Sequence, residues 1–243
     1  MSSSTMNGVE VTDRRGTLKF LSVVFGYMFI ALAITAATTF GFAFWFANLI
    51  VSNADNAAGI IITTMIVSGI AMLITSVVMS LTMFKQMKGA WVPFLLYAAI
   101  MGVFMSTFVM WIDAYTIGTA FGVTALVFLV MFCIGYFTKV SLSPLAFIAL
   151  GLLWTVILVS IPFGIIYLVS PTAALLMNYG ISLICAIAMM LIVGWDANRM
   201  SRDIQNGYVT KNLALYYASE FYSDFIMIFI HLLYLLAMAK SNN

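Results

Sequence analysis

The stretch from Asn212 to Ala239, NLALYYASEFYSDFIMIFIHLLYLLAMA, decides the fold of this chain. A run of about 20 mostly apolar residues is long enough to cross the hydrocarbon core of a bilayer as a helix. This run also carries three ionisable side chains, Glu220, Asp224 and His231. At roughly 100° per residue these three side chains lie within about 40° of one another, on one face of the helix.

This polar face predicts where the helix lies. An ionised carboxylate in hydrocarbon costs several kcal/mol, so such groups usually face the interior of a helix bundle or a wet cavity. We therefore expect this C-terminal helix to be central, with Glu220, Asp224 and His231 pointing away from lipid and Ile228 and Leu232 facing more outward. For Glu220 an alternative stays open, in which the helix starts late and this carboxylate lies near the lipid headgroups.

The composition of the whole chain agrees with a membrane protein. Of its 243 residues, 64% are hydrophobic and 7% are charged, whereas about 25% are charged in a typical soluble domain. The net charge of +2 comes without a basic cluster, so nucleic acid is not an expected partner. Cys133 and Cys185 both lie in apolar runs without metal-ligand spacing, and we expect small core residues rather than a disulfide. The sequence thus predicts an all-α integral membrane protein.

Charge-free runs divide the chain into seven transmembrane helices. The 56 uncharged residues between Lys139 and Asp196 are too many for one helix across a core of roughly 30 Å, and Ser170-Pro171 predicts the break between two. Pro162 predicts a kink in the fifth span. We expect residues 1–17 to be a flexible cytoplasmic N-terminus and residues 18–240 to form one seven-helix domain. The spans are expected at 20–54, 56–84, 91–112, 114–138, 143–170, 172–196 and 212–239.

The distribution of basic residues predicts the orientation. Nine of the ten Lys and Arg residues fall on the side of the N-terminus, and only Lys240 falls on the other. Basic residues are enriched in cytoplasmic loops, so the N-terminus is expected in the cytoplasm and the C-terminus outside. The short loops favour a prokaryotic plasma (inner) membrane.

Two aspartates on consecutive helices are the main candidates for chemistry. Asp196 ends the predicted sixth span and Asp224 lies about midway along the seventh. Two close carboxylates in a poorly solvated site do not both ionise readily, so the pair is expected to titrate as one unit. When ionised, the pair would offer hard oxygen ligands to Ca²⁺, with carbonyls, waters and Glu220 completing the shell. In the alternative interpretation, Asp196 pairs with Arg199 at the headgroup level.

Around these aspartates the chain resembles a known family. Trp195-Asp196-Ala197-Asn198-Arg199, then Leu215-Tyr216, then Phe221-Tyr222-Ser223-Asp224-Phe225-Ile226 are similar to the closing signature of the Bax inhibitor family, the transmembrane Bax-inhibitor-motif proteins. Met101-Gly102-Val103 and the stretch from Thr138 to Ser143 agree with it, and the likeness runs over nearly the whole chain from residue 18. The resemblance implies a seven-helix fold with the last helix central. It also implies a pH-sensitive Ca²⁺ leak, with Asp196 and Asp224 as a di-aspartyl sensor.

The chain also departs from the family pattern. Described members carry a basic residue in the second helix that can latch onto the aspartates, but no Lys or Arg lies between Asp55 and Lys85 here. Arg199 or Lys211 would have to replace that latch. The remaining departures are Trp195 for Tyr, Ala197-Asn198 for Thr-Gln, and Met227 for Asn.

Three function classes follow. The first is the cation leak, with no enzymatic activity and no cofactor beyond transient Ca²⁺, and with Glu220, Arg199 and His231 in supporting positions. The second is a modulator that binds a membrane protease or another membrane complex, a role with which some bacterial relatives are associated. The third is an intramembrane aspartyl protease, which would use two aspartates as acid and base. Those proteases carry Gly-x-Gly-Asp, whereas this chain reads Phe221-Tyr222-Ser223-Asp224, so the motif fails its context test.

Overall fold

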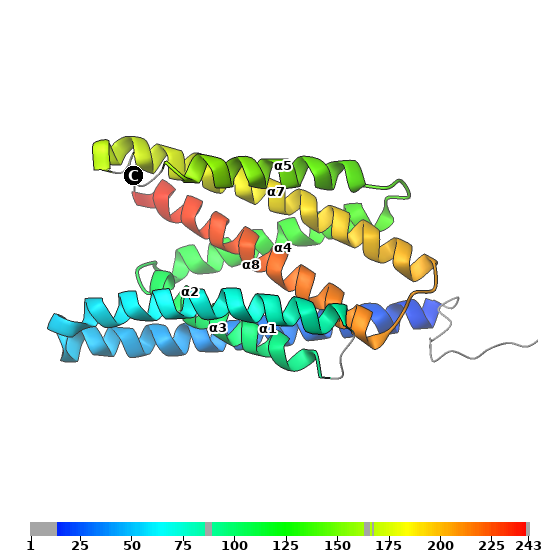
Figure 1. The fold of residues 1–243 in the computed structure, drawn as a ribbon, viewed down its shortest axis with the longest axis horizontal. Coiled ribbons are helices and arrows are strands. Elements are labelled where there is room, and N and C mark those ends of the chain that lie inside the picture. Colours follow the sequence, from blue (N-terminus) through cyan, green and yellow to red (C-terminus); the bar gives the residue numbers. More distant parts are fainter. Residues whose placement is uncertain (1–13, 86–88, 163–165, 167, 242–243) are drawn as a thin grey trace, which may run out of the picture. The chain divides into compact units, whose positions relative to one another are not determined.

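A computed structural model describes residues 14–85, 89–162, 166 and 168–241 of the chain. In these residues the secondary structure consists of seven long α-helices without a strand, and each helix is long and apolar enough to cross a membrane. The prediction of an all-α protein with seven membrane-spanning helices is confirmed. The helices are α1 (Arg14–Ser52), α2 (Ala54–Phe84), α3 (Trp91–Val109), α4 (Ala114–Phe137), α5 (Ser143–Ser160), α7 (Pro171–Gln205) and α8 (Lys211–Ser241), as Figure 1 shows.

The chain forms two compact units, and α8 contributes to both. Unit 1 consists of Met1–Asp113 together with Gly207–Tyr222, and unit 2 consists of Ala114–Asn206 together with Ser223–Asn243. The first part of α8 therefore belongs with α1, α2 and α3, and the remainder belongs with α4, α5 and α7.

In unit 1, α3 packs against α1 and α2, and its contact with α1 is unusually close. A Cβ atom at Gly102 would collide with Oγ1 of Thr38 and with the carbonyl oxygen of Thr35. Oγ1 of Thr39 donates to the carbonyl of Gly102 at 3.1 Å, and Oγ1 of Thr35 donates to the carbonyl of Ala98 at 3.0 Å. Small residues and hydroxyls at a helix contact are a common way to join transmembrane helices, because lipid supplies no hydrophobic force to do so.

In unit 2, α7 packs against both α4 and α5, and α5 runs beside α7 in Figure 1. A Cβ atom at Gly135 of α4 would collide with the carbonyl of Gly194 of α7. The second part of α8 is held by Asn178, whose Nδ2 donates to the hydroxyl of Tyr234 at 2.8 Å. Phe225 of α8 also makes edge contacts with the ring of Phe121, at a centroid distance of 5.5 Å.

The distribution of apolar and acidic side chains agrees with a membrane protein. Large apolar side chains point outward, among them Phe29 at 72%, Phe147 at 76% and Leu168 at 83% exposure. In water such a surface would drive aggregation, but in lipid it carries no penalty. Asp196 and Asp224 are instead 1% and 4% exposed, so these two carboxyl groups are buried inside the protein.

Prolines set several helix boundaries. The predicted break at Ser170-Pro171 is confirmed: α7 begins there, and the Ser170 side chain accepts a hydrogen bond from the Ala173 N–H at 3.4 Å. In the fifth span, Pro162 coincides with the end of α5 at Ser160 and not with a kink inside that helix. Proline has no N–H to continue the i→i−4 ladder, which explains why the regular helix stops before it.

Two other boundaries differ from the prediction. The sixth span was expected to end at Asp196, but α7 continues to Gln205, and the connection to α8 comprises only residues 206–210. Gly207 provides the turn with a φ of 76°, a conformation that glycine adopts at little cost. At the other end of the chain, α1 already begins at Arg14, and residues 1–13 of the expected N-terminal segment lie outside the described residues.

Candidate functional site

The two predicted aspartates are both buried, and both belong to unit 2. Because α7 extends nine residues beyond Asp196, this aspartate lies inside the helix rather than at its end. Its side chain is 1% exposed, and that of Asp224 is 4% exposed. Burying a carboxylate is expensive unless the site compensates its charge or protonates it. Two such groups in one unit are therefore the clearest sign of a functional site in the described part of the chain.

The hydrogen bond between Asn178 and Tyr234 joins α7 to α8. Counted from this bond towards the 206–210 connection, Asp224 lies 10 residues along α8 and Asp196 lies 18 residues along α7. The two aspartates of the predicted pair thus both lie between this bond and the connection, with Asp196 nearer to the connection along the chain.

The three residues predicted to support the site are each half-buried, namely Glu220, Arg199 and His231. The guanidinium of Arg199 lies over the ring of Trp195, 5.7 Å from its centroid, which is a cation–π arrangement.

The expected outward position of Ile228 is wrong. Ile228 is fully buried and Leu232 is half-buried, whereas Met227 is 37% exposed. The reason is helical spacing, because Ile228 follows Asp224 by four residues and so shares its buried face.

Sequence reasoning missed the role of Tyr222, two residues before Asp224. Its side chain is fully buried, and its hydroxyl lies 2.7 Å from Oγ1 of Thr35 in α1. The rings of Phe94 and Tyr97 from α3 meet it edge-on at centroid distances of 5.6 and 6.1 Å. Tyr222 therefore fixes α8 to two other helices of unit 1 immediately before the acidic residue.

Asn198, two residues after Asp196, was noted only as a departure from the family pattern. Its side chain is fully buried and holds the connection between α4 and α5. Nδ2 donates to the carbonyls of Thr138 at 2.7 Å and Gly135 at 3.3 Å, and Oδ1 accepts from the N–H of Leu142 at 3.2 Å. An amide so close to a buried aspartate in an apolar helix is the signal that could have identified it.

The structure offers limited means of holding a metal. In the residues it describes, no group of three or more His, Cys, Asp or Glu side chains could hold a metal ion together. Any ion at the aspartates would therefore need backbone carbonyls or waters as further ligands. Cys133 and Cys185 are free thiols, half-buried and buried respectively.

Comparisons with known proteins agree with the resemblance noted from the motifs. The model of the protein family described as "Inhibitor of apoptosis-promoting Bax1" matches residues 17–242 of this chain. An uncharacterised protein of Borreliella burgdorferi is 27% identical to it over 230 residues, which cover 92% of this chain and 94% of that protein. The match extends over all seven helices and includes both buried aspartates.

Proposed function

Because the chain belongs to the Bax inhibitor family, we propose that it is a pH-sensitive cation leak of the membrane, with Ca²⁺ as its ion and Asp196 and Asp224 as its sensor. The observation that carries this proposal is the burial of both carboxylates in unit 2. A transmembrane bundle that only needed to be stable would place apolar residues there, since ionisable groups inside the membrane are costly.

The mechanism follows from the two charge states of the pair. When both carboxylates are ionised, they repel each other and attract a divalent cation, which accepts hard oxygen ligands. When they take up protons, the site loses its negative charge and its affinity for the cation. A change of pH therefore alters both the cation binding and the charge that α7 and α8 carry inside unit 2, which is the kind of two-state element that a gate requires.

The basic latch of other family members has no counterpart in α2. This helix carries Asp55 and no Lys or Arg between Ala54 and Phe84. In the proposed mechanism the closed state depends instead on protonation of the aspartates and on packing around them. Enzymatic chemistry and a bound cofactor are not part of this proposal.

We also propose that the protein lies in the plasma membrane of a prokaryote, with the N-terminus in the cytoplasm. The support is the excess of Lys and Arg on one side of the seven spans. An alkaline phosphatase fused after Asn243 should be active, and green fluorescent protein fused there should stay dark. The opposite pair of signals would reverse this orientation.

The test of the leak is Ca²⁺ efflux from proteoliposomes between about pH 6 and 8. Wild-type protein should release Ca²⁺ at a rate that depends on pH. Asp196→Asn and Asp224→Asn should each flatten that dependence, and the double variant should be little worse than either one, because removing one partner already destroys the coupled unit. Asp55→Asn is the matched control, since this aspartate lies exposed in the first turn of α2, and it should keep the wild-type profile.

Other outcomes point to the other function classes. Protein that is folded but passes no ion at any pH would contradict the leak and favour a modulator of another membrane protein. If Asp196→Asn keeps the pH profile while Asp224→Asn flattens it, the paired sensor is wrong and Glu220 is the next candidate. Cleavage of a model transmembrane peptide that stops in both Asn variants would instead support a protease.

A further inference from the structure

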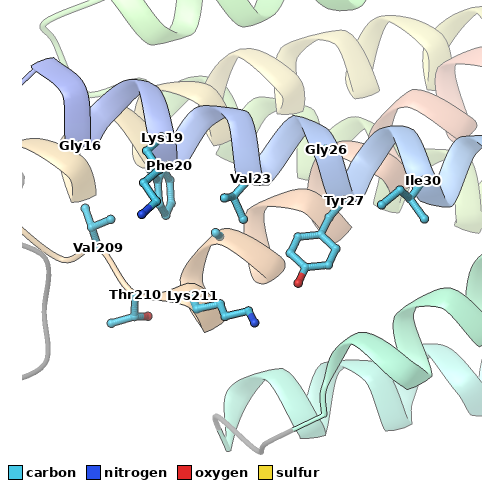
Figure 2. Close-up of a pocket in the computed structure, with 11 residues that line it drawn as sticks. Gly16, Lys19, Phe20, Val23, Gly26, Tyr27, Ile30, Val209, Thr210 and Lys211 are labelled. Carbon is cyan, nitrogen blue, oxygen red and sulfur yellow. The ribbon is translucent and has the colours of Figure 1, made fainter.

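A second candidate site is formed by residues of unit 1 alone. The beginning of α1 and the segment that leads into α8 enclose a cavity of about 500 Å³. Lys19 of α1 and Lys211 of α8 both line it. Figure 2 shows the side chains of Val23 and Tyr27 descending from α1 towards the segment that carries Thr210 and Lys211.

The charged side chains that line this cavity are all positive. Two lysines from different helices line it, and the described residues around it include no Asp or Glu. Arg15, one helical turn before Lys19, is exposed at the same end of α1. Two ammonium groups that share a cavity without a carboxylate attract an anion, and phosphate is an anion that lysine binds well.

The rest of the lining is apolar and extends along α1. From Lys19 to Ile30 the lining follows three turns of the helix, about 16 Å, and Val23 and Ile30 contribute apolar side chains on the way. A free phosphate ion would use the lysines but would leave this wall uncovered. An acyl chain would cover it, so the shape and chemistry of the cavity fit a lipid better than a soluble anion.

Gly26 leaves room along this wall. It lies in the middle of the wall, and a Cβ atom added there would meet no other atom within 4 Å. Other glycines of the chain, such as Gly59, have the same open space, but among them Gly26 lines the cavity. An acyl chain can therefore lie close to the backbone of α1 at this position.

We propose that this cavity binds one anionic phospholipid, with the headgroup phosphate between Lys19 and Lys211 and one acyl chain along Val23, Gly26 and Ile30. Tyr27 presents its ring to the chain and its hydroxyl to the glycerol region, as amphipathic side chains do at a membrane interface. Basic pockets between transmembrane helices are a general way to hold anionic lipid headgroups. This site does not depend on ion conduction by the protein.

Native mass spectrometry of the purified chain tests the proposal. The probes are dioleoyl-phosphatidylglycerol, dioleoyl-phosphatidylcholine with the same acyl chains, and glycerol 3-phosphate as a headgroup without chains. Wild-type protein should retain one phosphatidylglycerol in preference to phosphatidylcholine, and glycerol 3-phosphate should not displace it. The double variant Lys19→Gln/Lys211→Gln should bind phosphatidylglycerol about 30-fold more weakly, because it loses the electrostatic attraction of two lysines to the anionic headgroup. Gly26→Leu should weaken both lipids, because its side chain fills the path of the acyl chain.

Matched controls separate this site from general effects. Lys85→Gln/Lys139→Gln removes the same charge from two exposed lysines that do not line the cavity, and Gly59→Leu adds the same side chain at another glycine with open space around it. Both control variants should bind lipid like the wild type, and all variants should elute as single peaks with unchanged circular dichroism. Unchanged binding in Lys19→Gln/Lys211→Gln would overturn the proposal. So would displacement by glycerol 3-phosphate together with unchanged binding in Gly26→Leu, which would indicate a phosphate site without a lipid.

Discussion

The Tyr222 hydroxyl lies 2.7 Å from Oγ1 of Thr35, and this contact joins residues 187 positions apart in the sequence. Oγ1 of Thr35 also lies 3.0 Å from the carbonyls of Ala31 and Ala98. One threonine hydroxyl thus links α1, α3 and α8 in unit 1. The contact lies two residues before Asp224 in the sequence, at the end of the part of α8 that belongs to unit 1.

Replacing Tyr222 with Phe should test this link. The ring contacts with Phe94 and Tyr97 remain, and Thr35 keeps backbone carbonyls as partners, so the loss is one buried hydrogen bond. The free energy of unfolding, measured by SDS titration in mixed micelles, should fall by about 1 kcal/mol. Tyr115→Phe is the control, because Tyr115 is 80% exposed, and it should unfold like the wild type. Equal stability of the two variants would contradict a role of the hydroxyl in holding α8.

Asn198→Ala should destabilise unit 2 more strongly. The substitution removes two donated bonds and one accepted bond at the α4–α5 connection, and the groups left behind are buried backbone N–H and C=O. We expect a loss of about 2–3 kcal/mol in the free energy of unfolding, together with faster hydrogen exchange at residues 138–142. The matched control is Asn48→Ala, whose exposed amide bonds only to Phe44 of its own helix. A loss no larger than that of Asn48→Ala would show that Asn198 does not hold the connection.

Gly135→Ala tests the close approach of α4 and α7. The added methyl group would collide with the carbonyl of Gly194, so the two helices must separate. Overpacking of this kind typically costs about 1–3 kcal/mol, and the midpoint of thermal unfolding should fall. Gly122→Ala on the same helix meets open space and should leave stability unchanged or slightly raised. Identical behaviour of the two alanine variants would mean that α4 and α7 do not pack this closely.

Binding of Ca²⁺ should weaken as the pH falls. Protons and Ca²⁺ compete for the ionised forms of Asp196 and Asp224, so acid removes the ligands that the cation needs. Isothermal titration of the protein in detergent at pH 8 and pH 6 should give a lower affinity at pH 6. Asp224→Asn should bind weakly at both pH values. An affinity that rises towards acid pH would exclude the two carboxylates as the Ca²⁺ ligands.

Much of the helix pattern could be predicted from the sequence, because charge-free runs and prolines act locally. The break at Ser170-Pro171 and the last helix are where composition places them. The end of α7 was predicted too early, because the polar residues after Asp196 were interpreted as a loop. Residues after Asp196 are polar, but Asn198 and Ser201 are buried, and the amide of Asn198 finds its partners in another part of unit 2.

The sequence could predict that the two aspartates of the candidate site are buried, but not which residues of other helices lie beside them. A carboxylate in an apolar run indicates a buried polar group, and both aspartates are buried. The contact of Asn178 with Tyr234 was not predicted, because no local pattern specifies which residues of two helices lie side by side. The partner of Tyr222 was unpredictable for the same reason, because Thr35 is one of several threonines in α1.

The division of α8 between the two units has a consequence for biosynthesis. Unit 1 is discontinuous, since Gly207–Tyr222 completes it only after all of Ala114–Asn206 has been made. While the ribosome synthesises α4 to α7, the first three helices are already present, but Thr35 and Phe94 cannot yet contact Tyr222. Helix α8, which is made after α4 to α7, thus completes unit 1. A nascent chain stopped at residue 206 would have every other described helix and yet neither unit complete.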